Sequence, residues 1–168
     1  MKPLNFTRTV FIDRSFGGHR LLTLLSKTGF DVHGHKEFFV DDEDDHIWIP
    51  DIAARGWIIF TSDERISRDP INVKAVLESK AQVIITSDNN RLPEVWGAAF
   101  TVGRLRLDEL LDVNPGPVYI KLTSATGGHV HQTKRHITHP LASIPSDPPA
   151  LETTNSANAF FADFIKLR

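Results

Sequence analysis

Short apolar runs alternate along the chain with stretches in which apolar residues recur every three or four positions. The runs predict β-strands at residues 9–13, 57–63, 81–88 and 117–123, and a further short strand at 31–35. The periodic stretches predict helices at residues 19–30, 44–56, 69–80 and 91–113. Continuously apolar strands that alternate with helices are typical of a parallel sheet covered on both faces. The pattern therefore predicts an α/β fold with a central, mainly parallel sheet.

Proline and glycine refine these elements. Pro50 falls inside a predicted helix, so we expect it to kink that helix or to divide it. Pro70 stands where a helix tolerates proline best, in the first turn. Residues 125–128 read Ala-Thr-Gly-Gly and predict a turn, which would pair the preceding strand with residues 129–133 in a short hairpin.

The character of the chain changes near residue 133. We expect a folded domain at 1–132, a polar, proline-rich linker at 133–155 and a short amphipathic helix at 156–168. The apolar face of that last helix would consist of Phe160, Phe161, Phe164 and Ile165. Such a helix could dock on its own domain or on a twin chain, or it could await a separate partner.

Composition and charge narrow the class of protein. The 168 residues suit one domain with a true hydrophobic core. The absence of cysteine excludes disulfides and thiolate metal sites and is compatible with the cytoplasm. No run is apolar enough to span a membrane, and the N-terminus does not read as a secretion signal. With a net charge of -2, any binding of nucleic acid must come from a local patch.

Three of the predicted strands end with an aspartate: Asp13, Asp63 and Asp88. The carboxyl ends of parallel strands share one edge of the sheet, which is where ligands bind in such folds. Asp13 and Asp63 could instead cap helices or form turns. For Asp88, followed by two asparagines, a turn is the favoured interpretation.

Five acids in a row, residues 41–45, precede an apolar stretch. Most of them should face water or complement the dipole of the helix that follows. Asp45 is different, because it lies one helical turn before Trp48 and should share its core-facing edge. It could then face Asp13 and Asp63, and three carboxylates that meet require a cation such as Mg²⁺ between them. A lysine or arginine that filled the gap would contradict this hypothesis.

Basic and hydroxyl side chains flank the predicted acids. Arg14 and Ser15 follow the first acid, and Arg65 and Arg68 follow the acid at residue 63. Arginines around an acidic centre can bind the phosphates of a substrate backbone. They could equally be solvated side chains that pair with surface acids.

Two weaker signals remain. A transition metal could bind the histidines of the predicted hairpin, although no carboxylate or cysteine supports such a site. These histidines are His129, His131, His136 and His139. Gly17 and Gly18 precede a helix and could approach a phosphate, but no Gly-Lys-Ser/Thr signature follows them.

The segments FIDRSFGG, DDHIWIPDIAARGWIIFTSDERI and NPGPVYIKL resemble the PIN-like ribonuclease family. The most similar branch is that of compact PIN-like proteins related to the toxin ribonucleases of bacterial toxin–antitoxin pairs. The resemblance covers about residues 8–125. Its most specific part is the succession of an acid, a tryptophan, Ala-Arg-Gly, an apolar strand and Thr-x-Asp.

The resemblance implies a three-layer α/β/α sandwich and cleavage of RNA phosphodiester bonds with Mg²⁺ or Mn²⁺. It assigns catalytic and metal-binding roles to Asp13, Asp45 and Asp63, with Ser15 as the nearby hydroxyl. Asp44 and Asp42 are register alternatives to Asp45, and Asp69 and Asp88 are candidates for a fourth acid. The implied partners are RNA, a cognate antitoxin protein and a second copy of the chain, in the cytoplasm and away from membranes.

Two other functions stay open at this point. A non-catalytic module could keep the PIN-like fold and work by binding alone. A phospho-acceptor receiver module also places acids, a hydroxyl and a lysine at strand ends, and Asp13, Asp63, Thr86 and Lys121 fit that pattern loosely. Against it, a receiver carries paired acids after its first strand, where this chain has Asp13 and Arg14.

Overall fold

The computed structural model describes residues 6–86, 92–124 and 130–136, with backbone alone for 124 and 130–136. The strands are β1 Val10–Ile12, β2 Val32–Gly34, β3 Ile58–Thr61, β4 Gln82–Thr86, β5 Val118–Ser124 and β6 Val130–His136. The α-helices are α1 Arg20–Lys27, α2 Asp45–Ala54, α3 Pro70–Ser79 and α4 Pro93–Asp112. Three short 3₁₀ helices follow strand ends: η1 Arg14–Phe16, η2 His35–Glu37 and η3 Glu64–Ser67.

The strands form one sheet in the order β2-β1-β3-β4-β5-β6. The first five strands are parallel, and β6 pairs antiparallel with β5. The prediction of a mainly parallel sheet is therefore confirmed, and so is the antiparallel pairing that the hairpin required. β6 runs to His136, so residues 133–136, which were expected to open the linker, belong to the sheet. The remainder of the predicted linker and the amphipathic helix lie outside the described residues.

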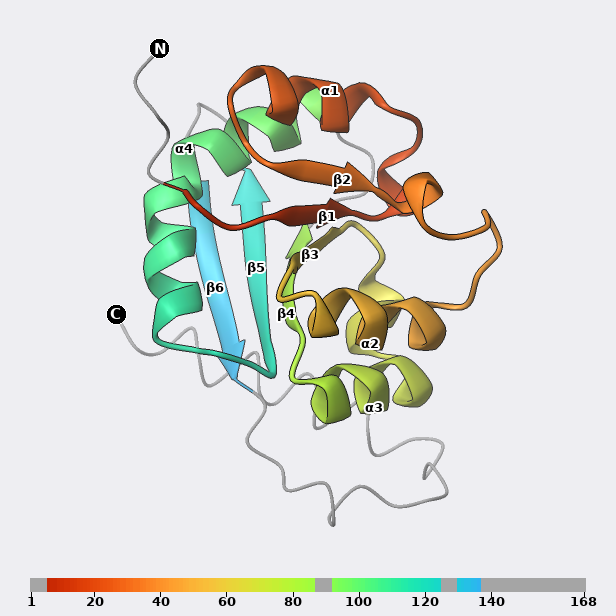
Figure 1. Cartoon of the computed structure of the whole chain (residues 1–168). Helices are drawn as coiled ribbons and strands as arrows, with labels where there is room; N and C mark the ends of the chain where they lie inside the picture. Colours follow the sequence, from red (N-terminus) through yellow and green to blue (C-terminus); the bar gives the residue numbers. More distant parts are fainter. Residues whose placement is uncertain (1–5, 87–91, 125–129, 137–168) are drawn as a thin grey trace.

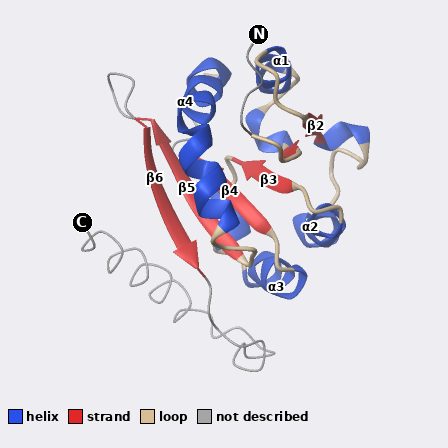
Figure 2. Cartoon of the chain, turned by 60° about the vertical axis from the view of Figure 1, so that its left-hand side comes forward, coloured by secondary structure: helices blue, strands red, loops and turns tan. Residues whose placement is uncertain are grey.

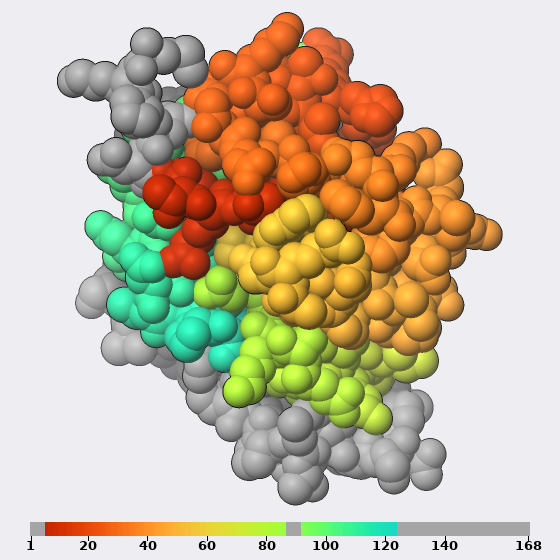
Figure 3. Space-filling view, viewed as in Figure 1, coloured from red at the N-terminus to blue at the C-terminus, as the bar shows by residue number. Residues whose placement is uncertain are grey.

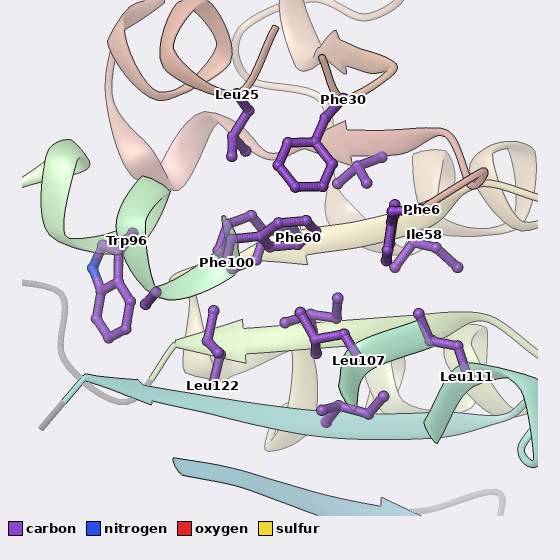
Figure 4. Packing of buried hydrophobic residues seen from close by; sticks show 14 of the residues in the cluster. Phe6, Leu25, Phe30, Ile58, Phe60, Trp96, Phe100, Leu107, Leu111 and Leu122 are labelled. Carbon is purple, nitrogen blue, oxygen red and sulfur yellow. The ribbon is translucent and has the colours of Figure 1, made fainter. Parts of the chain in front are cut away.

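Two hydrophobic cores lie on opposite faces of the sheet, because alternate residues of each strand point to opposite sides. Val10, Ile58 and Phe60 pack on the face covered by α1 and α4, together with Phe6, Phe30 and Phe100 of Figure 4. Phe11, Ile59 and Val83 pack on the other face, against α2 and α3. Figures 1 and 2 show the resulting three layers, with the two helix pairs on either side of the sheet. The α/β/α sandwich is thus confirmed.

Of the two outcomes expected at Pro50, a kink or a division of its helix, the division does not occur. α2 runs without a break from Asp45 to Ala54. Pro50 itself is exposed, while Trp48, Ile49 and Ile52 are fully buried. A proline costs a helix one backbone hydrogen bond, but here its ring lies on the solvent side and the apolar face stays intact. Burial of that face against the sheet holds the helix together.

The carboxyl ends of β1, β2 and β3 are where the chain leaves the sheet into η1, η2 and η3. In Figure 1 the arrowheads of β1 and β2 point toward the segment that leads into α2. The space-filling view shows that the segments around α2 and α3 lie side by side on one face of the molecule (Figure 3). This edge of the sheet therefore collects the side chains of strand ends and of the first turn of α2. Within the described residues, none of the helices combines the length and apolar character that crossing a membrane demands.

Candidate functional site

Asp13 ends β1 and is almost completely buried, with 4% of its surface exposed. Its Oδ2 accepts a hydrogen bond of 2.7 Å from the hydroxyl of Thr61, the last residue of β3. Its Oδ1 is buried and has no hydrogen-bond partner among the described residues. A buried carboxylate with one donor carries a large desolvation cost. Its position thus concentrates negative charge that only one donor balances.

Thr61 connects the ends of β1 and β3. Its oxygen accepts the backbone N–H of Asp63 at 3.0 Å and lies 3.2 Å from the hydroxyl of Ser15. Since the one hydroxyl hydrogen of Thr61 goes to Asp13, Ser15 must donate to Thr61. Ser15 in turn accepts the backbone N–H of Ser62 at 2.9 Å. The acids of the two strands are thus joined through a single hydroxyl.

Asp45 opens α2 and faces inward, with 10% of its side chain exposed. Its Oδ2 lies 3.3 Å from the amide nitrogen of Asn72, a buried residue of α3. Burial and the negative charges of Asp13 and Asp63 raise the pKa of Asp45. The charge of Arg14 and a contact with the indole N–H of Trp48 act in the opposite direction and lower that pKa. The three predicted acids are therefore close enough to act on one another electrostatically.

Asp63 caps η3 and is 17% exposed. It accepts hydrogen bonds from the backbone N–H of Arg65 at 2.9 Å and from the Arg65 guanidinium at 2.6 Å. Burial alone would raise the pKa of Asp63, but the hydrogen bonds and charge of Arg65, helped by Arg14, outweigh it and hold the pKa below its usual value. Asp63 is therefore ionised at neutral pH and already carries one counter-ion.

Arg14 is the cation nearest to the rest of the cluster. One of its terminal nitrogens lies 3.5 Å from Oδ1 of Asp45, and the other donates to the carbonyl oxygen of Asp41 at 2.6 Å. Its charge also acts on Asp63. An arginine thus contributes positive charge beside Asp45. The sequence hypothesis would be contradicted by a lysine or arginine that filled the gap between Asp13 and Asp63. Arg14 is partly exposed, and it reaches Asp45 at salt-bridge distance rather than at hydrogen-bond distance.

The lower-ranked acids lie apart from this cluster or outside the described residues. Asp69 caps α3, where it accepts the backbone N–H of Ile71 at 3.0 Å, and it is exposed. Asp44 is the exposed N-cap residue of α2, and Asp42 is exposed as well. Asp88 lies outside the described residues.

The arginines at 65 and 68 were expected either to bind substrate phosphates or to pair with surface acids. Arg65 and Arg68 are exposed and pair with Asp63 and Glu64, so they reach solvent while bound to neighbouring acids. Thr86 is buried at the end of β4. The histidine-rich hairpin lies in residues whose side chains are not described.

Sequence reasoning missed three residues at this edge. Thr61 was visible only as part of the Thr-x-Asp succession, without a role. Asn72 and His35 are polar residues that are buried. A polar residue on the inner face of the helix at 69–80, or at the end of the strand at 31–35, is the signal that could have found them.

The donor atoms of Asp13, Asp45 and Asp63 are of the type that a hard divalent cation prefers, although their present arrangement does not form a metal site. All are carboxylate oxygens, one oxygen of Asp13 is buried without a partner, and the pKa of Asp45 is raised partly by like charges. These features fit Mg²⁺ or Mn²⁺. Nevertheless, among residues 6–86, 92–123 no three acidic or histidine side chains are already arranged to hold a metal ion. Binding of an ion by Asp13, Asp45 and Asp63 would therefore require these side chains to rearrange.

Comparison with known proteins identifies the family to which the chain belongs. A family profile described as "PIN like domain" matches residues 9–88, the segment that contains Asp13, Asp45 and Asp63. A protein of Mycobacterium tuberculosis (strain ATCC 25618 / H37Rv) named "Putative ribonuclease VapC45" is 30% identical over 95 residues, which cover 54% of this chain and 69% of that protein. This chain belongs to the PIN-like family. The comparison with solved structures gave no match.

Membership of the PIN-like family confirms the resemblance seen in the sequence. It leaves the receiver-module alternative without support, since that alternative rested on a loose pattern of strand-end residues. The PIN-like match ends at residue 88, so β5 and β6 lie beyond it.

Thr61→Val should lower the free energy of unfolding by about 1–3 kcal/mol, because it removes the only donor to a buried carboxylate while preserving shape. Thermal unfolding at neutral pH measures this. Thr101→Val is the matched control, since the hydroxyl of Thr101 bonds only the carbonyl of Gly97 within α4. Equal losses in the two variants would contradict a special role for Thr61.

Asp45→Asn should raise the melting temperature at neutral pH, by about 2–4 °C for each kcal/mol of repulsion relieved. A carboxyl whose pKa is raised on folding destabilises the protein while it is ionised, and the penalty disappears as the pH falls through that raised pKa. The advantage of Asp45→Asn should therefore shrink in acid. Asp51→Asn, on the exposed side of α2, should give no such rise. A lower melting temperature for Asp45→Asn at neutral pH would contradict the prediction.

Proposed function

We propose that this PIN-like protein is a metal-dependent endoribonuclease that cleaves RNA phosphodiester bonds. The observation that supports this best is the electrostatic coupling of three carboxylates from separate elements. Asp13 comes from the end of β1, Asp45 from the start of α2 and Asp63 from the end of β3, and the first and last raise the pKa of the second. The relative named as a ribonuclease supports the same activity.

Asp13, Asp45 and Asp63 would hold one Mg²⁺ or Mn²⁺ ion. When bound, such an ion lowers the pKa of a water molecule and stabilises charge on the phosphate. Asp13 would supply its unpartnered oxygen, and Thr61 would keep that carboxylate oriented through Oδ2. Asn72 would hold Asp45 in the same way from α3.

Arginines at the rim would bind the RNA backbone. Arg65 and Arg68 are exposed beside Asp63, and a guanidinium can donate two hydrogen bonds to one phosphate. Arg14 would leave Asp45 when the ion binds and become available for a phosphate. Ser15, with an exposed side chain at the same edge, would add a hydroxyl contact.

The family relationship suggests the setting of this activity. We propose that the protein acts in the cytoplasm as the toxin of a toxin–antitoxin pair, with a cognate antitoxin protein and a second copy of the chain as partners. The name of the Mycobacterium relative supports the ribonuclease activity. Copurification of a small protein encoded with this chain would test the antitoxin proposal.

A non-catalytic binding module is the second candidate. Arg14 and Arg65 already pair with Asp45 and Asp63, which is how a chain without a metal would balance its acids. In that case neither Mg²⁺ nor Mn²⁺ would bind, and the arginines would be permanent partners. Calorimetric titration with Mn²⁺ separates the two candidates.

Asp13→Asn should abolish Mn²⁺ binding and lower cleavage of labelled RNA by at least about 100-fold, because the loss of several kcal/mol of charge stabilisation costs tenfold for each 1.4 kcal/mol. A panel of single-stranded and structured RNAs serves as substrate, and circular dichroism checks the fold. Asp51→Asn removes one exposed acid of α2 and should leave both properties unchanged. Full metal-dependent cleavage by folded Asp13→Asn would refute the assignment.

Arg14→Gln should shift two affinities in opposite directions. Mn²⁺ should bind about 2- to 5-fold more tightly, because an ion pair worth about 0.5–1 kcal/mol no longer competes for Asp45. RNA should bind more weakly when measured by fluorescence anisotropy without divalent metal, because one phosphate contact is lost. Unchanged Mn²⁺ affinity would show that Arg14 does not occupy the place of the cation.

A further inference from the structure

His35 lies directly beside Asp13 in the sheet. β1 and β2 are parallel, and Ile12 is in register with Gly34. Asp13 and His35 are therefore the next residues on two neighbouring strands, whose separation is about 4.8 Å. Both residues stand where the chain turns into a 3₁₀ helix.

The side chain of His35 is buried but has no hydrogen bond. It is 2% exposed, and neither ring nitrogen has a partner among the described residues. Its ring packs among those of Phe11, Phe39 and Trp48, with centroids 6.0, 5.4 and 5.8 Å away. A buried unpaired polar atom costs about 1–3 kcal/mol, whereas leucine or phenylalanine would fill such a space without that cost. Packing alone therefore does not account for a histidine here.

The surroundings of His35 point to Asp13 as its partner. Burial lowers the pKa of His35, so the ring is neutral at pH 7 and offers one N–H donor. Asp13 is the charge that acts on it most strongly, followed by Arg14, Asp41 and Glu43. Oδ1 of Asp13 is itself buried without a partner. Two unsatisfied groups of complementary type thus lie on adjacent strands.

Asp13 is flanked by one polar residue from each neighbouring strand. Thr61, from β3, donates to Oδ2. His35, after β2, lies on the opposite side, because β1 is between β2 and β3 in the sheet. At this position His35 is better placed to orient the carboxylate of Asp13 than to bind the metal ion itself.

We propose that His35 is a positioning residue for Asp13, donating a ring N–H to Oδ1, directly or through one water, and so fixing the carboxylate for the metal ion. The inference rests on the proposed metal-dependent function. Groups that hydrogen-bond a ligating side chain orient it, and their loss costs about 10–100-fold in metal affinity. No residue of the proposed catalytic set already fills this role at Oδ1.

The test measures Mn²⁺ affinity by calorimetry and the melting temperature of the metal-free protein. His35→Leu and His35→Phe should match or exceed the wild-type melting temperature, because unpaired polar atoms leave the core. Both should bind Mn²⁺ about 10- to 100-fold more weakly. Having two apolar variants keeps the test decisive if one of them does not fold.

Conservative variants supply the rescue. The amide nitrogen of Asn corresponds to Nδ1 of histidine and that of Gln to Nε2, so His35→Asn or His35→Gln should restore Mn²⁺ affinity and thereby identify the donor nitrogen. Phe39→Leu is the control, since it alters a ring that packs on His35 but removes no polar atom. It should leave Mn²⁺ affinity unchanged.

The outcomes separate this inference from the function on which it rests. If the wild type binds Mn²⁺, Asp13→Asn does not, and both apolar variants bind as the wild type does, the role of His35 is refuted while the metal site stands. If the apolar variants lose affinity and neither amide restores it, a hydrogen bond from residue 35 is refuted as well. If the wild type binds no Mn²⁺, both the metal site and the inference fall.

Discussion

The parallel register of β1 and β3 places a carboxylate where the protein can barely solvate it. Asp13 is 4% exposed, and the hydroxyl of Thr61 is the only donor that reaches it among the described residues. Two further acids, Asp45 and Asp63, lie close enough that the pKa of Asp45 is raised. Negative charge in such surroundings must be balanced, and the rest of this edge of the sheet can be understood as the means of balancing it.

Arginines balance part of this negative charge. Arg65 binds Asp63 closely, while Arg14 reaches Asp45 at 3.5 Å and leaves Asp13 without a cation in contact. The compensation is thus uneven: it is strongest at Asp63, the least buried of the three acids, and the described residues place no ion-pair partner at Asp13, the most buried one. A divalent ion would complete it at the point where the arginines do not reach.

Much of the fold could be predicted because a strand that is buried on both faces of a sheet appears in the sequence as a continuous apolar run. The predicted strands at 9–13 and 57–63 contain the continuous apolar runs 10–12 and 57–60. Because the strands are parallel, the acids that follow these runs fall at one edge of the sheet. The inward orientation of Asp45 followed from its spacing to Trp48. A division at Pro50 was one of two outcomes expected because the local cost of a proline was weighed without knowing that the ring would face solvent.

The contacts between the acids could not be predicted, because they depend on register between strands that are distant in sequence. Thr61 meets Asp13 across 48 positions, and Asn72 meets Asp45 across 27. Nothing in the local pattern fixes such pairs. Likewise, the conflict between Arg14 and a cation arises only when η1 and the first turn of α2 are brought together. The sequence predicts the edge of the sheet and its acids, whereas the fold determines which side chains contact those acids and balance their charge.

The most direct measurement is a crystal structure of the protein soaked with Mn²⁺, in which anomalous scattering locates the ion. The account predicts one peak within about 2.0–2.3 Å of oxygens from Asp13, Asp45 and Asp63, with Arg14 turned away from Asp45. A fully soaked crystal with no peak there, and with Arg14 still bound to Asp45, would contradict it.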